Sequence, residues 1–158
     1  MTPSSPQPSR SSPPPIDALA VLLLDGEPCI DTIPGTEVEA SGVAGRGLFA
    51  RRAWSSGEVL GTLDGQVVDV TRYPAVEALE WNALAPDRLL VRAVRTSYGF
   101  MNHSPDANVA IDDDGRTMRA ARDLSPGDEL TLDYFAQPVP PAYLTSDEGR
   151  ALRAVGPA

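Results

Sequence analysis

The chain has 158 residues, of which 13 are Lys or Arg and 22 are Asp or Glu, so its formal net charge is -9. Such an acidic chain lacks the basic face that phosphate binding requires, which argues against nucleic acid as a direct partner. One cysteine and one histidine exclude a four-ligand Cys/His zinc site, and no other metal site is expected. The acidity suits a basic partner, although solubility alone also explains it.

The N-terminal part is predicted to be a tail followed by one apolar element. Residues 1–15 are rich in Pro and Ser and bury too little apolar surface to offset their ordering entropy, which predicts disorder. Residues 16–24 are predicted as a strand or a short helix, and a homodimer through this segment is an alternative. Their longest apolar run, residues 18–24, is shorter than the roughly 20 residues that cross a bilayer. No signal-peptide pattern precedes it, so we expect a cytoplasmic protein without a membrane segment.

The following stretch alternates apolar runs with turn residues, which is typical of a mostly β domain. A glycine-rich loop is predicted over residues 41–47, and short strands or apolar runs over residues 37–40, 48–50, 58–63 and 66–70. Asp64-Gly65 is typical of a hairpin turn, so the last two of these runs are predicted to pair. Residues 71–84 are predicted as a helix, because apolar residues recur near helical spacing and prolines suit both ends.

The second half continues the strand pattern and ends in a tail. Strands are predicted over residues 89–94, 109–112, 117–121 and 129–134. The acidic turn at residues 112–115 joins the second and third of them, and it lacks the spacing of a calcium loop. A tail begins at residue 137, in which residues 146–155 are predicted as a short helix capped by Ser146. We therefore expect one domain over residues 16–136, flanked by tails 1–15 and 137–158.

Three motifs carry groups suited to chemistry. Gly45-Arg46-Gly47 allows close approach of the backbone to a ligand, but it matches neither a dinucleotide fingerprint nor a P-loop and taken alone is a turn. Asn102-His103-Ser104 holds the only histidine of the chain, and no nucleophile elbow accompanies it, which argues against a Ser-His hydrolase. Asp133-Tyr134 closes a strand. Its phenol is either a residue at the edge of the core or a hydrogen-bond acceptor and weak general base.

In this order and spacing, the motifs resemble the SET-domain methyltransferases. The resemblance rests on residues 41–50, on Asn102-His103-Ser104 with Asn108, and on residues 127–134. Residues 57–60 and 64–65 lie where that family has its second pair of strands. It covers roughly residues 37–134, and the combination of blocks is specific.

The resemblance implies small curved β-sheets around a knot-like C-terminal core, with few short helices and S-adenosylmethionine as cofactor. It implies that the last strand passes beneath the segment carrying Asn102 and His103. It assigns the cofactor to the backbone at Ala44, Arg46 and Leu48 and to Asn102, His103 and Tyr134. It makes Tyr134 the catalytic residue. It also suggests a substrate channel lined by Phe135, Tyr98 and Tyr143, with the C-terminal tail covering the active site.

The chain departs from the family pattern around the channel. Tyr98-Gly99-Phe100-Met101 precedes Asn102, where the family usually has Arg-Phe, and no cysteine-rich segment follows the domain. The main hypothesis is a bacterial, S-adenosylmethionine-dependent N-methyltransferase acting on lysine side chains of a basic protein; the absence of Lys favours a high-GC genome. The alternatives are a methyltransferase acting on a small molecule or peptide, and a non-catalytic binding module of the same fold.

Overall fold

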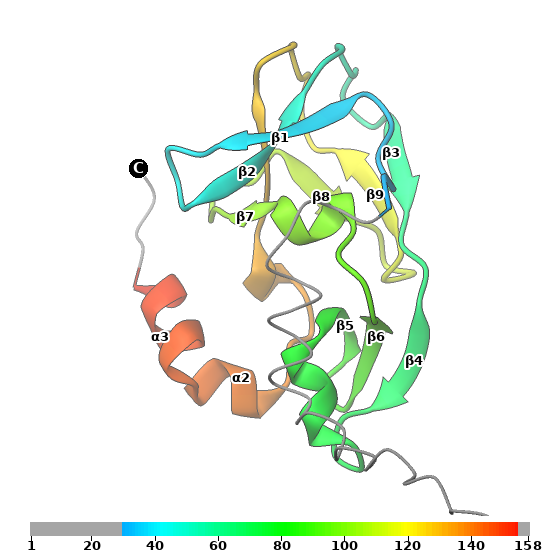
Figure 1. Ribbon diagram of the computed structural model, residues 1–158, viewed down its shortest axis with the longest axis vertical. Helices are drawn as coiled ribbons and strands as arrows, with labels where there is room; N and C mark the ends of the chain where they lie inside the picture. The colour runs from blue at the N-terminus through cyan, green and yellow to red at the C-terminus, as the bar shows by residue number, and fades with distance from the viewer. Residues whose placement is uncertain (1–29, 155–158) are drawn as a thin grey trace, which may run out of the picture.

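The computed structural model describes residues 30–154, whose strands form two sheets (Figure 1). In the larger sheet the order is β1-β2-β10-β8-β9-β3, and β7 pairs with β10. Its strands are β1 (Thr36–Ala40), β2 (Arg46–Ala50), β3 (Val59–Thr62), β7 (Asn102–His103), β8 (Val109–Ile111), β9 (Thr117–Ala120) and β10 (Glu129–Leu132). The smaller sheet has the order β4-β6-β5 and consists of β4 (Gln66–Asp69), β5 (Glu80–Ala85) and β6 (Arg88–Arg92).

Strand β10 brings together three segments that lie far apart in the sequence. It pairs antiparallel with β2 and parallel with both β7 and β8. Thr131 lies opposite Asn102, and Leu132 lies opposite His103. The side chain of Asn108, which directly precedes β8, accepts a hydrogen bond from the Thr131 amide of β10 at 2.9 Å. This side chain therefore extends the contact between β8 and β10. The curled, mostly β architecture confirms the predicted fold class, and β10 runs directly beside the Asn102-His103 segment.

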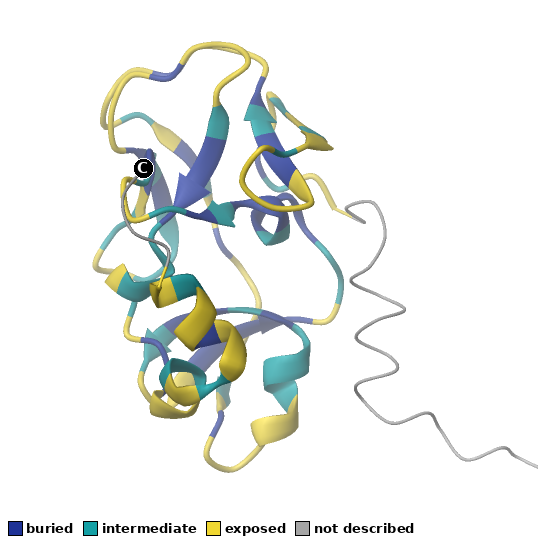
Figure 2. Ribbon diagram, turned by 90° about the vertical axis from the view of Figure 1, so that its left-hand side faces the viewer, coloured by how far each residue is buried: buried dark blue, intermediate teal, exposed yellow. Residues whose placement is uncertain are grey.

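Two apolar clusters stabilise the two sheets. The larger cluster includes Trp54, Leu48, Leu130 and Met118, all at most 1% exposed, and it fills the larger sheet. The smaller cluster surrounds the buried Leu89 of β6 and includes Val70, Ala83, Val91 and Val139, against which Trp81, Phe135, Tyr143 and Leu144 pack. Figure 2 shows buried stretches of the strands in dark blue and the exposed turns and helix faces in yellow.

The segment after β10 forms three short helices that lie beside the smaller sheet (Figure 1). They are η3 (Tyr134–Ala136), α2 (Pro141–Thr145) and α3 (Asp147–Arg153). Ser146 caps α3 by accepting a hydrogen bond from the Gly149 amide at 3.0 Å, which confirms the helix predicted there. Helix α2 was not predicted, although a proline at its first position suits a helix start. The rings of Trp81 and Tyr143 meet edge to face at 5.3 Å and join α2 to β5.

The predicted hairpin at Asp64-Gly65 is wrong. Strand β3 pairs with β9 in the larger sheet, whereas β4 pairs with β6 in the smaller one. Gly65 has a φ of +142°, and a Cβ at this position would lie 2.6 Å from the carbonyl oxygen of Val91. The glycine is therefore required by the close approach of two chain segments where the chain leaves one sheet for the other.

The predicted helix over residues 71–84 is also wrong. Only Pro74–Ala78 is helical, as the 3-10 helix η1, and the chain then extends into β5. Glu80 and Asn82 of β5 are buried, and both bond to Arg92 on β6 at 2.7 and 3.0 Å. These partners are distant in the sequence, so tertiary pairing overrides the local helical spacing.

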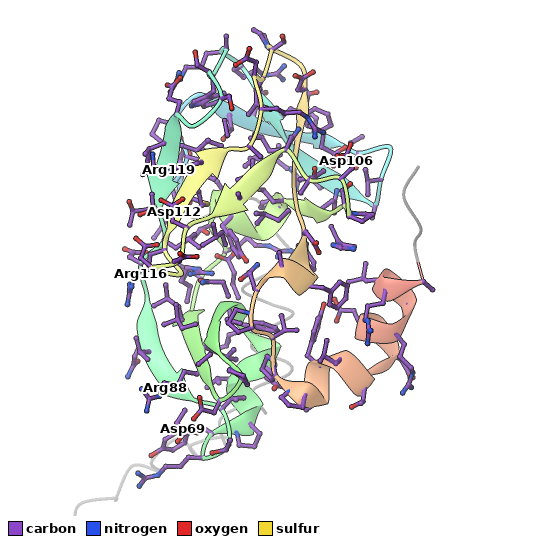
Figure 3. All side chains as sticks on the ribbon, turned by 180° about the vertical axis from the view of Figure 1, so that it is seen from behind. Asp69, Arg88, Asp106, Asp112, Arg116 and Arg119 are labelled. Atoms are coloured by element: carbon purple, nitrogen blue, oxygen red, sulfur yellow. The ribbon has the colours of Figure 1, made fainter. Side chains whose placement is uncertain are left out.

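Apart from the buried Glu80–Arg92 pair, several charged pairs lie on the outer surface. Arg119 and Asp112 form an ion pair at 2.7 Å on the β8–β9 hairpin, with Arg116 nearby on the same hairpin (Figure 3). Asp69 and Arg88 are opposite each other on β4 and β6, at the far end of the smaller sheet. Exposed pairs of this kind contribute at most about 1 kcal/mol each, so the fold depends mainly on its apolar clusters.

Two expectations concern the N-terminal segment before residue 30. The predicted tail over residues 1–15 and the apolar element over residues 16–24, with its alternative homodimer, lie outside the described residues. Within residues 30–154, no helix is long and apolar enough to cross a membrane. The same part of the chain holds no group of three or more His, Cys, Asp or Glu side chains suited to a metal ion.

Candidate active site

A pocket of about 390 Å³ lies between the smaller sheet and the C-terminal helices. Three predicted site residues, Tyr98, Tyr134 and Tyr143, line it together, although they come from η2 (Ser97–Phe100), η3 and α2. The other lining residues are Glu77, Leu79, Glu80, Trp81, Arg95, Gly99, Met101, Gln137, Val139, Ala142, Ser146 and Glu148. Aromatic walls with a few carboxylates suit a ligand that combines an apolar stem with a cationic head.

Tyr134 is fixed at both its backbone and its hydroxyl group. The hydroxyl donates a hydrogen bond to the carbonyl oxygen of Met101 at 2.6 Å, and the Tyr134 amide donates to His103 Nδ1 at 3.2 Å. Burial raises the pKa of the Tyr134 phenol well above its usual value of about 10. The phenol is therefore protonated at neutral pH, and its hydrogen is the one donated to Met101.

His103 supports the position of Tyr134 from the opposite side. Its Nδ1 accepts the amide hydrogen bond, so the ring carries its hydrogen on Nε2. The ring is buried and lies 5.3 Å from the Tyr134 ring and 5.1 Å from the Phe135 ring, measured between centroids. Asp133 Oδ1 is 3.8 Å from Nδ1. His103 thus connects β7 to the start of η3.

Asn102 connects β7 to the glycine-rich loop. Its Nδ2 lies within hydrogen-bond distance of the carbonyl oxygens of Ala44 and Arg46, at 3.1 and 3.2 Å. The same amide nitrogen contacts Ser41 Oγ at 3.0 Å and Glu129 Oε1 at 2.8 Å. The loop and the Asn102-His103 segment, 58 residues apart along the chain, therefore form one continuous surface.

Three of the predicted site residues, Arg46, Leu48 and Phe135, lie outside the Tyr134 pocket. The side chain of Leu48 is in the core, so only its backbone is available for the expected contact. Arg46 and Leu48 also line a second hollow, together with Asp31, Thr36, Glu37, Val38 and Ser97, and this hollow does not include Tyr134. Phe135 does not line the Tyr134 pocket; its ring packs against His103 and, at 6.4 Å, Tyr143.

Met101 and Tyr134 lie where the two regions meet. Both residues line the pocket, while Met101 directly precedes Asn102 in the chain and Tyr134 is bonded to His103. Met101 and Tyr134 therefore connect the pocket to the Asn102-His103 segment. This arrangement suits a transfer between two reactants that approach from opposite sides.

A buried polar cluster beneath the pocket was missed by sequence reasoning. Glu80 accepts hydrogen bonds from Arg92 Nε at 2.7 Å and from the amide and hydroxyl of Thr96 at 2.9 and 2.5 Å. Arg92 also lies over the Tyr98 ring, 4.9 Å from its centroid. Gly99 is required here, because a Cβ would lie 2.2 Å from Glu80 Oε2. No local sequence signal marks this cluster, because its members come from three separate elements.

Ser41 and Glu129 were also missed as site residues, although both lie inside the motifs on which the resemblance rests. The Ser41 hydroxyl donates to Glu129 Oε1 at 2.7 Å, and Glu129 in turn bonds to Asn102. Their position at the two ends of the motif pattern was the available signal. A glutamate at the start of a strand does not by itself indicate a site residue, because its partner Ser41 is brought to it only by the fold.

Comparison with known proteins gives a consistent result. The family model described as the SET domain matches residues 45–135. Two similar solved structures are a crystal structure of an active polycomb repressive complex 2 in the stimulated state and one of the Chaetomium thermophilum polycomb repressive complex 2. Their TM-scores are 0.54 and 0.53, at 19% and 18% identity, and each match covers 63% of this chain.

The match spans only 15% of each of those longer chains, and at this identity it shows the fold alone. No curated protein matches the chain.

Proposed function

The chain belongs to the SET-domain family, and from this we propose that it is an S-adenosylmethionine-dependent methyltransferase acting on lysine side chains of a protein. The observation that carries the proposal is the position of Tyr134. Tyr134 lines the pocket and its hydroxyl donates to the carbonyl oxygen of Met101, while its backbone amide donates to His103 on the other side of the junction. A transfer reaction needs such a junction, because both reactants must be aligned at one point.

The acceptor oxygens at this junction fit the proposed cofactor. When bound, S-adenosylmethionine supplies a methyl group already activated by a positively charged sulfur. Oxygen atoms that accept weak C–H···O contacts favour such a methyl group, and the Tyr134 hydroxyl and the Met101 carbonyl are two of them. The residues that would hold the cofactor are the backbone at Ala44, Arg46 and Leu48, the side chain of Asn102, and His103.

The pocket residues would bind the lysine side chain and favour its neutral form. A lysine ammonium has a pKa of about 10.4 in water and must lose a proton before its nitrogen can attack. Glu77 and Glu148 attract the ammonium group to the pocket, and the aromatic walls hold its aliphatic stem. Removal from water near Tyr134 then lowers the lysine pKa and favours the neutral amine. Because the Tyr134 phenol stays protonated, the departing proton passes to solvent.

A second candidate function is methylation of a small molecule or a short peptide. The observation that favours it is the pocket volume of about 390 Å³, within the usual range for small-molecule sites of roughly 300–1,000 Å³. Arg95 on the pocket lining would suit an acceptor that also carries a carboxylate.

The two candidates are separated by incubating the purified protein with methyl-labelled S-adenosylmethionine and a cell lysate, which is then fractionated by size. Label in the macromolecular fraction is the expected result. Label confined to the small-molecule fraction favours the second candidate. A protein that neither transfers label nor binds the cofactor contradicts both.

A further inference from the structure

The carboxylate of Glu129 lies at the centre of the polar contacts that join the glycine-rich loop to β7. It accepts the Ser41 hydroxyl at 2.7 Å on Oε1 and 2.9 Å on Oε2, and it accepts Asn102 Nδ2 at 2.8 Å. Ser41 Oγ itself accepts the amides of Val43 and Ala44 at 2.8 and 3.2 Å. One charged group on β10 therefore fixes both the turn of the loop and the orientation of the Asn102 amide.

The glycine at position 47 provides independent support for this arrangement. A Cβ on Gly47 would lie 2.3 Å from Glu129 Oε1 and 3.1 Å from the Cβ of Ser41. Gly47 lies in β2 without the positive φ that would explain a glycine. The space is needed for the Glu129 carboxylate, so the sequence of the loop is adapted to this side chain.

The charge of Glu129 strengthens this connection. Hydrogen bonds to an ionised acceptor are shorter and about twice as strong as neutral ones, and the site is only partly exposed to competing water. Besides Ser41 and Glu129, the Asn102 amide contacts only the carbonyl oxygens of Ala44 and Arg46. Both belong to the loop that Ser41 holds, so they cannot fix the orientation of the amide by themselves. Loss of Glu129 would therefore release the loop and Asn102 together.

We propose that Glu129 is a positioning residue of the cofactor site, which holds the Ser41–Gly47 loop and the Asn102 amide in the arrangement that binds the cofactor. The proposal rests on the proposed function, since it concerns the same site. Glu129 need not touch the cofactor, because it acts through Asn102 and the loop.

The test compares Glu129→Ala, Glu129→Gln and the control Glu58→Ala in the full chain. Glu58 is also a hydrogen-bonded glutamate, but it precedes β3, at the opposite end of the sheet order from the loop. Calorimetric titration with S-adenosylmethionine should show affinity about tenfold weaker for Glu129→Ala, the order expected for losing hydrogen bonds to a charged group. Glu129→Gln should lie between Glu129→Ala and the wild type, because it keeps the Oε1 acceptor but loses the charge. Glu58→Ala should match the wild type.

Hydrogen exchange without cofactor gives a second measurement. The amides of residues 41–47 should exchange faster in Glu129→Ala than in the wild type, while β8 and β9 keep their protection. Unchanged loop exchange, or unchanged affinity, in a folded Glu129→Ala protein overturns the proposal. A wild-type protein that does not bind the cofactor contradicts the proposed function instead, and loop exchange still tests the positioning role.

Gly47→Ala breaks the same contacts without removing the carboxylate. It should weaken cofactor affinity about as much as Glu129→Ala, and the double variant should be no weaker than either single one, because both changes remove one interaction. Additive losses would show that Gly47 and Glu129 act separately. Position 47 would then not be a glycine in order to leave space for the Glu129 carboxylate.

Discussion

Replacing Tyr134 by Phe removes one hydroxyl group and keeps the ring that packs against His103. The hydroxyl bonds to the carbonyl of Met101 at 2.6 Å, and Met101 is only 2% exposed, so the substitution leaves a buried acceptor without its partner. We expect a loss of about 1–3 kcal/mol in the free energy of unfolding. Turnover should fall on the order of 100-fold, or about 3 kcal/mol, as for the loss of one positioned polar group at a reacting centre.

The assay measures kcat with a saturating lysine substrate, and cofactor affinity separately by calorimetry. Affinity should change little, because the loop and Asn102 are untouched. Tyr143→Phe is the matched control: it removes a hydroxyl from the same pocket and should cost far less turnover. Wild-type turnover in folded Tyr134→Phe protein would refute the role given to Tyr134, and an equal loss in both variants would show that the pocket responds to any lost hydroxyl.

Three further predictions follow from the site and its surroundings. Asn102→Ala should weaken cofactor binding about tenfold, measured by calorimetry, because it removes the link between loop and β7. Arg92→Leu should lower the free energy of unfolding by about 3–5 kcal/mol in urea titrations, because it leaves Glu80 buried and unpaired. Burial, followed by the Glu148 charge, raises the pKa of Tyr143 to about 12. Between about pH 10 and 12 the phenol loses its proton in the unfolded chain but keeps it in the folded one. The contribution of Tyr143 to the free energy of unfolding should therefore be constant up to about pH 10 and fall between about pH 10 and 12.

Each of these predictions has an outcome that contradicts it. Unchanged affinity in Asn102→Ala would remove Asn102 from the cofactor site. A loss below about 1 kcal/mol in Arg92→Leu would mean that the carboxylate finds water or another partner. For the alkaline transition, the Tyr143→Phe variant should lose less stability above pH 10 than the wild type, and identical curves would assign the transition to other groups.

The strand-rich character of this domain was predictable because each short apolar run is bounded by turn residues that act locally. Pairing partners were not, as Asp64-Gly65 illustrates. Its sequence is typical of a hairpin, yet the glycine is there because Val91 of β6 passes within van der Waals distance. Residues 71–84 likewise have apolar residues near helical spacing, but Glu80 is buried in a strand because Arg92 and Thr96 bond to it.

The site was predictable in part for a different reason. The resemblance and their aromatic character assign Tyr98 and Tyr143 to the substrate channel, and the resemblance makes Tyr134 the catalytic residue. The fold brings all three to one pocket. Phe135 has the same character, but its place in η3 directs it to the other side, against His103. Glu129 was overlooked because its role depends on Ser41, 88 residues away.

Transfer of methyl groups to lysine, as proposed for this chain, is best tested by mass spectrometry of a digested protein substrate. The substrate is first reacted with labelled S-adenosylmethionine and either the wild-type protein or the Tyr134→Phe variant. We expect methyl groups on lysine side chains with the wild-type protein and far fewer with the variant. Methyl groups on other side chains only, or equal lysine labelling by both proteins, would overturn the proposal.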